Sequence, residues 1–280
     1  MKLNFINFYN NSLKDCKFEK RPHFAVAVSG GPDSMALINL LTKYANRTKA
    51  TITPLIVNHG LRKNSLKEAK WVSSELKEKN LIPKILNVNK NKIKRRNMSE
   101  ARTNRFNKLL KYCKDNNILY LFLAHHHDDD IETFINRKLL GSDFEGLQSI
   151  NKNTIIDKIK ILRPFLIFTK DQIYKYNKME NIKFVEDPSN YDHSYTRPII
   201  REFIKNNKNY KKNIYNEFNY IKKNIPLYKT MVWQIFNKNM VSTNKNKLLM
   251  NYDFIIENDD LVIEKILNYI YKFFNSYKKY

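Results

Sequence analysis

The sequence is poor in cysteine, in glycine and in acidic residues. Only two of its 280 residues are cysteine, Cys16 and Cys113, and they form no CxxC pair. This scarcity gives no indication of a disulfide framework or of a cysteine-ligated zinc or iron–sulfur site. A reducing, cytoplasmic compartment is therefore expected.

Long apolar runs are also missing. The N-terminal stretch MKLNFINFYNNSLKD is interrupted by asparagine and lacks the continuous apolar core of a secretory signal peptide. No later segment approaches the roughly 20 consecutive apolar residues that a bilayer-spanning helix needs. The sequence therefore predicts a protein that does not reside in a membrane.

Acidic residues are outnumbered by basic ones. The chain has 51 Lys plus Arg against 27 Asp plus Glu, a formal net charge of +24, and the basic residues are spread along its whole length. A polyanionic partner such as nucleic acid would explain this excess. AT-rich coding would scatter lysines just as widely, and composition alone leaves both explanations open. The 42% hydrophobic content is sufficient for a sizeable core.

Short apolar runs alternate with amphipathic stretches through the first two-thirds of the chain. The runs predict strands at 24–28, 52–57, 82–88 and 119–124, and the stretches predict helices at 34–45, 65–79 and 99–114. This alternation predicts an α/β fold, with an open, mostly parallel, Rossmann-like sheet and helices on both faces.

The composition changes after about residue 204. Lysine, asparagine and tyrosine interleave there, as in KNNKNYKKNIYNEFNYIKKNI. We expect one domain over residues 1–205 and a small helical domain over residues 206–280. The lysines of this second region are either nucleic-acid contacts or the solvated face of an amphipathic helix.

Two of the five glycines stand side by side in AVAVSGGPDSM, residues 25–35. The loop contains Ser29, Gly30, Gly31, Pro32, Asp33 and Ser34. It leaves a predicted strand and enters a predicted helix, at the sheet edge where α/β proteins bind ligands. Glycines permit close backbone approach, serines add hydroxyl groups, and a helix N-terminus attracts an anion. The loop is thus either a phosphate site or a plain connection, and it matches neither GxxxxGK[ST] nor GxGxxG.

The complete string SGGxDS resembles the pyrophosphate-binding loop of the ATP pyrophosphatase superfamily. Members of that superfamily cleave ATP between the α- and β-phosphates and adenylate an oxygen of their substrate. The resemblance implies an adenine nucleotide α-hydrolase-like fold with ATP as cofactor. A carboxylate beside phosphates is reasonable when Mg²⁺ bridges the two, so Asp33 is expected to be a catalytic residue and a Mg²⁺ ligand.

Four further strings narrow the resemblance. They are NHGLR at 58–62, EARTNRF at 100–106, AHHHDDDIET at 124–133, and EDPSN at 186–190 followed by Tyr195, Arg197 and Arg201. In order and spacing they resemble the tRNA(Ile)-lysidine synthase family over approximately residues 20–205. Pro198 replaces an asparagine of the family pattern. This departure puts any contact of that side chain in doubt and leaves both arginines for the RNA backbone.

The acidic run predicts a binding site for an amine. Asp129 and Glu132 are three residues apart on a predicted helix, so they share one face and are able to hold an ammonium ion. The resemblance implies that they bind lysine, with one of them as a candidate base. The alternative is that residues 128–130 only favour a helix N-terminus electrostatically.

Histidine and arginine residues complete the expected site. Three consecutive histidines cannot face one metal ion on regular secondary structure, so we expect His125 and His126 to contact the nucleotide rather than zinc. Arg102 and Arg105 are three apart on a predicted helix and are either surface cations or a clamp for a phosphate or carboxylate, with Arg105 also assigned to catalysis.

The rim of the predicted sheet supplies further candidates. Asn58 and His59 end the second predicted strand, where they either contact the nucleotide or form a turn. Tyr195 is grouped with Arg197 and Arg201 as a tRNA contact.

The resemblance implies a two-step reaction. ATP adenylates the C2 oxygen of the wobble cytidine of tRNA(Ile) with a CAU anticodon, and the ε-amine of L-lysine then expels AMP. The product is lysidine, and the tRNA reads AUA instead of AUG. With this reaction, residues 1–205 are expected to form the ATP-binding catalytic domain and residues 206–280 to contact the tRNA. A homodimer is left open.

Rival functions share only part of the pattern. tRNA thiolases need reactive cysteines or an iron–sulfur cluster. NAD and GMP synthetases share SGGxDS without NHGLR and HHxDDxxET. A basic RNA-binding module with a decayed site would not be expected to keep Ser29, Asp33, Asp129 and Glu132.

Overall fold

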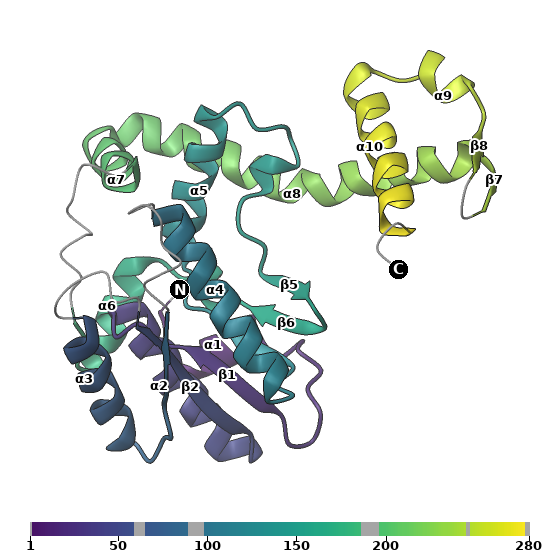
Figure 1. The fold of residues 1–280 in the computed structure, drawn as a ribbon. Helices are drawn as coiled ribbons and strands as arrows, with labels where there is room; N and C mark the ends of the chain where they lie inside the picture. Colours follow the sequence, from purple (N-terminus) through teal and green to yellow (C-terminus); the bar gives the residue numbers. More distant parts are fainter. Residues whose placement is uncertain (1, 59–64, 89–97, 186–195, 245–246, 278–280) are drawn as a thin grey trace. The chain divides into compact units, whose positions relative to one another are not determined.

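The computed structural model describes residues 2–58, 65–88, 98–185, 196–244 and 247–277 (Figure 1). The chain divides into two compact units. The first unit contains Met1–Leu139 and Ser149–Asn206, and the second contains Leu140–Gln148 and Asn207–Tyr280. The sequence places a boundary at 205/206 but gives no sign that residues 140–148 group with the C-terminal region.

A six-stranded sheet forms the centre of the first unit. Its strands are β1 (His23–Ala27), β2 (Thr51–Asn58), β3 (Lys84–Asn87), β4 (Tyr120–Phe122), β5 (Asn153–Ile156) and β6 (Ile159–Leu162). They are ordered β3-β2-β1-β4-β6-β5, and all neighbours are parallel except β5 and β6. The predicted open, mostly parallel sheet is therefore confirmed.

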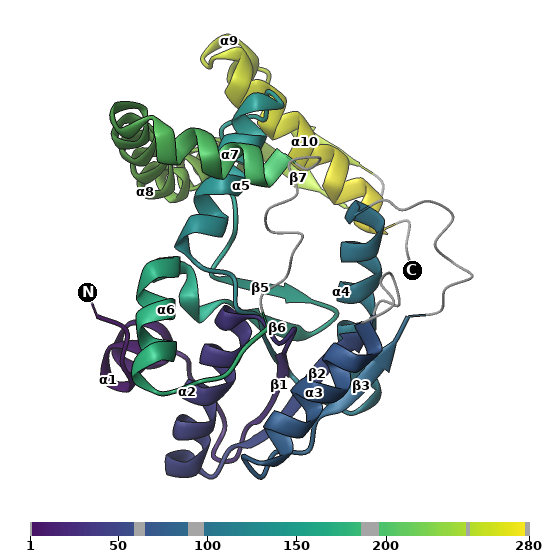
Figure 2. The same ribbon diagram turned by 90° about the vertical axis from the view of Figure 1, so that its left-hand side faces the viewer.

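Helices cover both faces of this sheet. The helices of the first unit are α1 (Phe5–Phe8), α2 (Pro32–Thr48), α3 (Ser65–Lys77), α4 (Met98–Asp115), α5 (His127–Leu139), α6 (Lys170–Met179) and α7 (Thr196–Asn206), with the short helices η1 (Tyr9–Leu13) and η4 (Pro164–Ile167). Side chains alternate across β1, so Phe24 and Val26 pack with α2 and α6 while Ala25 packs with α4. Figure 2 shows α2 and α6 on one side of the sheet and α4 on the other.

The strand order reverses next to β1. The chain runs from β1 outward through β2 to β3, then returns to place β4 on the other side of β1. The loops that follow β1 and β4 therefore leave the carboxyl edge of the sheet side by side. In open α/β sheets this reversal point is where ligands bind.

Two details of the first unit differ from expectation. The β5–β6 hairpin adds an antiparallel edge that the apolar pattern did not predict. The sequence KFVE at 183–186 contains the β-forming residues Phe184 and Val185 and so resembles a strand, but its described residues 183–185 form none. Instead, the Val185 amide donates a single hydrogen bond of 2.9 Å to the Gly30 carbonyl, which attaches this segment to the glycine loop.

The second unit is helical, with one small hairpin. Its elements are η3 (Gly146–Gln148), α8 (Lys208–Asn239), β7 (Met240–Thr243), β8 (Leu248–Met250), α9 (Asp253–Ile256) and α10 (Asp260–Tyr277). Val232 and Phe236 of α8 pack with Phe254, Val262 and Ile266. The predicted helical C-terminal region is confirmed, and the antiparallel β7–β8 pair is added to it.

Residues 140–148 belong to this second unit through specific contacts. The Lys265 ammonium of α10 lies 2.5 Å from a Glu145 carboxylate oxygen. The Phe144 ring packs edge-on against Tyr228 of α8, with 5.3 Å between the ring centroids. Within the ranges described above, no helix combines the length and apolarity that crossing a bilayer requires.

Candidate functional site

The glycine loop is fastened by its own serines. Gly31 is the N-cap of α2, and Pro32 follows at the first helical position. The Ser34 hydroxyl accepts the Ser29 amide hydrogen at 3.2 Å and donates to the Gly31 carbonyl at 3.0 Å. The Ser29 hydroxyl accepts the Gly31 amide hydrogen at 3.4 Å. The loop is thus held closed around a helix N-terminus, a position that favours a phosphate group.

Gly30 has a backbone conformation that other residues rarely adopt. Its φ angle is +87°, and a Cβ atom built on it would lie 2.5 Å from the Val72 Cγ2 atom of α3. Both the left-handed conformation and the close approach of α3 require glycine at this position.

Replacing Gly30 with alanine is therefore expected to destabilise the protein. The strain at positive φ and the clash with Val72 should together lower the free energy of unfolding by about 1–3 kcal/mol. The measurement is urea denaturation. Gly31→Ala is the matched control, because Gly31 has a φ of −71° and its Cβ would meet nothing closer than 3.6 Å. Equal losses of stability in the two variants would contradict the prediction.

His126 lies between the glycine loop and the acidic helix. The Asp129 amide donates to His126 Nδ1 at 3.3 Å, so Nδ1 is the acceptor and Nε2 is the ring nitrogen that carries a proton. Nε2 is 3.8 Å from the Asp33 Oδ2 atom and 3.6 Å from the Asp129 Oδ2 atom. The buried imidazole therefore links a carboxylate that follows β1 to one that follows β4.

Asp33 has an unused carboxylate oxygen. Its Oδ1 atom is buried and accepts no hydrogen bond from the described residues. Burial raises the pKa of Asp33, and the charge of Asp129 adds to this effect, while His126 and Lys170 oppose it. Mg²⁺ is usually held by one or two carboxylates together with phosphate oxygens. Asp33 fits such an ion, although the described residues include no cluster of three or more ligands that would hold a metal ion alone.

The three consecutive aspartates at the start of α5 have different partners. Asp128 accepts the Lys170 amide hydrogen at 2.7 Å, and Asp130 accepts the Ile150 amide hydrogen at 2.7 Å. These two carboxylates fasten neighbouring segments of the chain. Asp129 Oδ2 accepts the His126 amide hydrogen at 3.1 Å and lies 3.6 Å from His126 Nε2, the ring nitrogen that also approaches Asp33. Asp129 is therefore the member of the run directed toward the glycine loop.

Arginines from α7 meet the carboxylates of α5. Arg197 Nη1 lies 3.7 Å from an Asp129 oxygen. The Arg201 guanidinium donates two hydrogen bonds to Glu132, from Nε at 2.5 Å and from Nη2 at 3.2 Å. Arg197 and Arg201 are one turn apart on α7, and the carboxylates that they contact are one turn apart on α5. The sequence assigned both arginines to RNA, and the structure places them against the expected amine site.

The pKa values of Asp129 and Glu132 shift in opposite directions. Burial acts to raise the pKa of Asp129, but the His126 side chain, Arg197 and a hydrogen bond from the His126 amide outweigh it and lower the pKa. Burial raises the pKa of Glu132, and Arg201 opposes that rise. A guanidinium stays protonated in proteins, and two hydrogen bonds from it require an ionised acceptor, so Glu132 is an anion in this pair.

Arg102 and Arg105 of α4 form a cationic cluster with Arg197. Desolvation lowers the pKa of both α4 arginines, and the positive charge of Arg197 lowers it further. In the part of the chain that the structure describes, neither side chain forms an ion pair with a carboxylate closer than 4 Å. The three positive charges therefore act on one another, and a bound anion would relieve this repulsion.

The remaining expected residues lie on the same sheet edge or outside the described ranges. Burial lowers the pKa of His125 to about 4, so its ring is neutral. Its buried Nδ1 atom has no hydrogen-bond partner among the described residues. The Asn58 side chain donates to the Asn87 side chain at 3.1 Å, across the ends of β2 and β3. His59 and Tyr195 lie outside the described residues.

One supporting residue is not visible in the sequence motifs. The buried Asn177 side chain of α6 donates to the Pro32 carbonyl at 2.9 Å and so attaches the glycine loop to α6. The apolar periodicity of α6 could have indicated it, because Asn177 occupies an inward position beside Ile173 and Tyr176 in this amphipathic helix. A buried asparagine at an apolar position usually has a specific hydrogen-bond partner.

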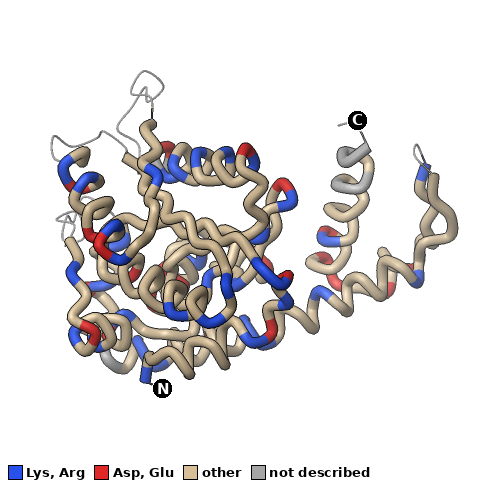
Figure 3. Tube along the Cα trace, turned by 90° about the horizontal axis from the view of Figure 1, so that it is seen from below, with Lys and Arg blue, Asp and Glu red and all other residues tan. Residues whose placement is uncertain are grey.

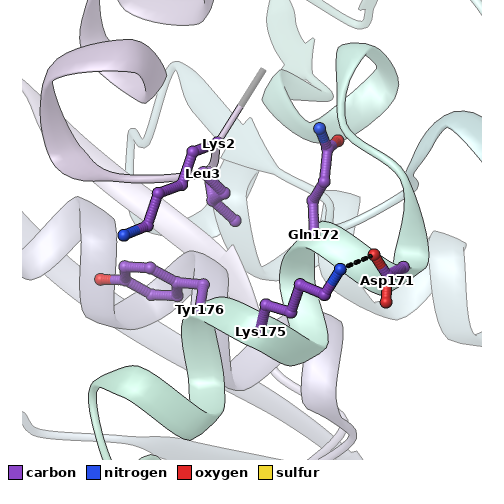
Figure 4. Close-up of a pocket in the computed structure, with 6 residues that line it drawn as sticks. All are labelled: Lys2, Leu3, Asp171, Gln172, Lys175 and Tyr176. Atoms are coloured by element: carbon purple, nitrogen blue, oxygen red, sulfur yellow. Dashed lines mark ion pairs between the residues drawn. The ribbon is translucent and has the colours of Figure 1, made fainter.

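A separate hollow lies between the N-terminus and α6. It has a volume of about 300 Å³ and is lined by Lys2, Leu3, Asp171, Gln172, Lys175 and Tyr176 (Figure 4). Lys175 is paired with Asp171 at 2.7 Å, and the Tyr176 hydroxyl donates to Asn39 at 2.6 Å. None of the loop, histidine or arginine residues described above lines this hollow, so we do not assign it to the site.

The sequence is similar to a known domain family and to curated proteins. A family model described as a PP-loop domain matches residues 1–208. The chain is 41% identical over 204 residues to a tRNA(Ile)-lysidine synthase of Wolbachia pipientis wMel and 36% identical over 200 residues to one of Orientia tsutsugamushi (strain Boryong). These matches cover 72% and 71% of this chain and 45% of each relative. The chain thus spans about half the length of the curated relatives it matches.

A solved structure shares the fold. The U34-tRNA thiolase NcsA from Methanococcus maripaludis, solved with its [4Fe-4S] cluster, superposes with a TM-score of 0.63 at 19% identity, covering 79% of each chain. At this identity the likeness concerns the fold alone. The family model matches the part of the chain that contains the doubly wound sheet and the closed SGGxDS loop after β1. The chain therefore belongs to the PP-loop domain family.

Proposed function

We propose that this protein is a tRNA(Ile)-lysidine synthase, which joins free lysine to C2 of the wobble cytidine of tRNA(Ile) at the expense of ATP. The observation that carries the proposal is the meeting of Asp33, His126 and Asp129 where the strand order reverses. One residue comes from the nucleotide loop and another from the expected amine site. The identity to curated lysidine synthases supports the same reaction.

In the first step the loop of residues 29–34 holds the phosphates of ATP. The α2 N-terminus and the loop amides face the anionic group, and the arginines of α4 add positive charge. The C2 oxygen of cytidine attacks the α-phosphorus atom, and pyrophosphate leaves. Magnesium, held by Asp33, would neutralise charge that develops on the phosphate oxygens.

The nucleotide base and ribose are expected to meet the same rim of the sheet. His125 is buried and neutral, so its ring is able to donate or accept one hydrogen bond without adding charge. Asn58, His59 and His126 complete this group of proposed nucleotide contacts.

In the second step the lysine amine replaces the adenylate. An anionic Asp129, whose pKa is lowered, attracts the ε-ammonium ion of lysine. The amine must lose a proton before it attacks C2, and a carboxylate at this position is suited to take it. A new carbon–nitrogen bond forms, the carbon–oxygen bond to the phosphate breaks, and AMP leaves.

The tRNA is the proposed polyanionic partner. Lysines and arginines are distributed over the whole described chain rather than gathered in one segment (Figure 3). We assign the anticodon nucleotide to the arginine-lined site and the backbone to dispersed surface lysines.

The decisive experiment supplies the purified protein with ATP, Mg²⁺, L-lysine and a transcript of tRNA(Ile) with a CAU anticodon. We expect pyrophosphate release that depends on the transcript, and a mass increase at nucleotide 34 that depends on lysine. A transcript with a changed wobble base is the control. Pyrophosphate release without any lysine incorporation would refute the assignment.

The cysteines distinguish this proposal from tRNA thiolation. Burial raises the pKa of Cys113 to about 12 and also raises the pKa of Cys16, so neither thiol is a ready nucleophile at neutral pH. The double variant Cys16→Ser, Cys113→Ala is expected to keep wild-type pyrophosphate release within about twofold, since only the thiolate is reactive. A loss of transcript-dependent activity in a folded double variant would instead favour thiolase chemistry.

A further inference from the structure

Glu132 already has a partner that an incoming ammonium ion would have to displace. Its side chain is 3% exposed and accepts both hydrogen bonds of a side-on Arg201 guanidinium. Asp129 is different, because its side chain is 14% exposed and its nearest guanidinium nitrogen is 3.7 Å away. The two carboxylates on one face of α5 are therefore not equivalent.

We propose that Glu132 is a positioning residue, which fixes Arg201 against a phosphoryl group, while Asp129 alone receives the ammonium ion of lysine. This inference rests on the proposed function and gives the two carboxylates of its amine site different roles. It assigns to Glu132 and Arg201 a task that neither the spacing of the carboxylates nor the basic motif around Arg201 indicates.

The geometry of the pair directs one end of Arg201 away from Glu132. The contact uses Nε and Nη2, so the Nη1 end of the guanidinium is left for another acceptor. The Arg201 side chain is 31% exposed, which keeps that end accessible. Arg201 also interacts electrostatically with Asp33 of the glycine loop. Glu132 lies one helical turn along α5 from Asp129, whose Oδ2 atom is 3.6 Å from the same His126 nitrogen that lies 3.8 Å from Asp33 Oδ2. The Arg201–Glu132 pair is thus one helical turn from the contacts that reach the glycine loop.

A phosphoryl group is the ligand class that this arrangement suits. Arginine binds phosphate oxygens through paired N–H groups, and a carboxylate behind it fixes the plane of the guanidinium. ATP and the RNA backbone both carry such groups. The pair lies on the face of α5 that reaches the glycine loop through Asp129 and His126, so a nucleotide phosphate is the favoured source. An ammonium ion at Glu132 would have to displace a hydrogen bond from Arg201, whereas within the described residues the guanidinium nearest to Asp129 is 3.7 Å away and donates no hydrogen bond to it.

Three single variants and one double variant test the inference. Glu132→Gln and Arg201→Lys should each lower kcat about 100-fold, as removal of one preorganised donor does, and should leave the KM for lysine within about threefold. Asp129→Asn should raise the KM for lysine at least about tenfold. Glu132→Gln combined with Arg201→Lys should be no worse than either single change, because the two residues act as one unit.

Calorimetry gives a readout that does not depend on lysidine formation. Glu132→Gln and Arg201→Lys should weaken ATP binding to a similar extent, Asp129→Asn should not, and Glu132→Asp should regain part of the loss. Thermal unfolding confirms that each variant is folded. Weakened tRNA binding with unchanged ATP binding would move Arg201 to the RNA and overturn the inference.

Two further outcomes separate the inference from the proposed function. A rise in the KM for lysine in Glu132→Gln equal to that in Asp129→Asn would show that both carboxylates bind lysine, and would overturn the inference alone. If the wild-type protein forms no lysidine, the proposed function fails, and the ATP affinities still decide whether Glu132 acts through Arg201.

Discussion

Replacing Asp33 with alanine is expected to abolish pyrophosphate release while the protein stays folded. The carboxylate is a proposed magnesium ligand beside the phosphates, and its Oδ1 atom has no hydrogen-bond partner among the described residues. Removing it should lower kcat by about 100- to 1000-fold or more, because charge that develops on the phosphates is no longer neutralised. The measurement is transcript-dependent pyrophosphate release at saturating ATP. Normal release by a folded variant would contradict both the site and the reaction.

Stability provides the control for this prediction. Burial raises the pKa of Asp33 above its ordinary value of 3.8, so the folded protein holds that proton more tightly than the unfolded chain. The stabilising effect of the proton is complete below that ordinary value and is lost as pH rises through the higher, folded-state pKa. At neutral pH the ionised group therefore opposes folding. Asp33→Asn should unfold at higher urea concentration than wild type at pH 7, and the difference should shrink below pH 4.

The affinity for tRNA(Ile) is expected to fall steeply as the salt concentration rises. The lysines of α8 should account for much of the slope of log affinity against log salt concentration. Among its exposed or half-exposed lysines are Lys211, Lys212, Lys222 and Lys223. Two of these ammonium groups lie within 6 Å of an aromatic ring, at 5.6 Å from Tyr215 and 5.4 Å from Phe218. Each phosphate contact contributes about 0.7–0.9 to the slope of log affinity against log salt concentration. Changing all four lysines to glutamine should thus reduce the slope by up to about 3.

A matched variant controls for the change in net charge. Lys77, Lys84, Lys114 and Lys158 are exposed and lie at the amino ends of the strands, opposite the glycine loop. Their replacement by glutamine removes the same charge and should leave the slope nearly unchanged. Equal slopes for the two quadruple variants would show that the lysines of α8 act through overall charge or solubility, and would remove α8 as an RNA contact.

The apolar pattern was sufficient to predict the central strands and their helices. β1, β2 and β4 each overlap the predicted runs to within two residues at either end, because a strand buried on both faces needs a continuous apolar segment. The β5–β6 hairpin was not predicted. Its edge strand β5 alternates exposed and half-buried residues over only four positions, which is too short for a clear period.

The site was predicted less completely than the fold. Residues within one string, such as Ser29 and Ser34, contact each other locally, so the string itself indicates the loop. The pairing of Arg201 with Glu132 joins residues 69 positions apart, and no local pattern specifies which basic side chain meets which acidic one. Asn177 is a similar case, since its partner Pro32 lies 145 positions away. Tertiary contacts of this kind required the folded structure.

The grouping of residues 140–148 with the C-terminal unit affects how this protein can be recombined with its relatives. The polypeptide passes from one unit to the other three times, after residues 139, 148 and 206. A chimera with a single junction at residue 206 would retain Phe144 and Glu145 but lose Tyr228 and Lys265, their partners. The C-terminal unit is therefore not a transferable cassette, and grafting it onto a relative would require a second exchange at residues 140–148.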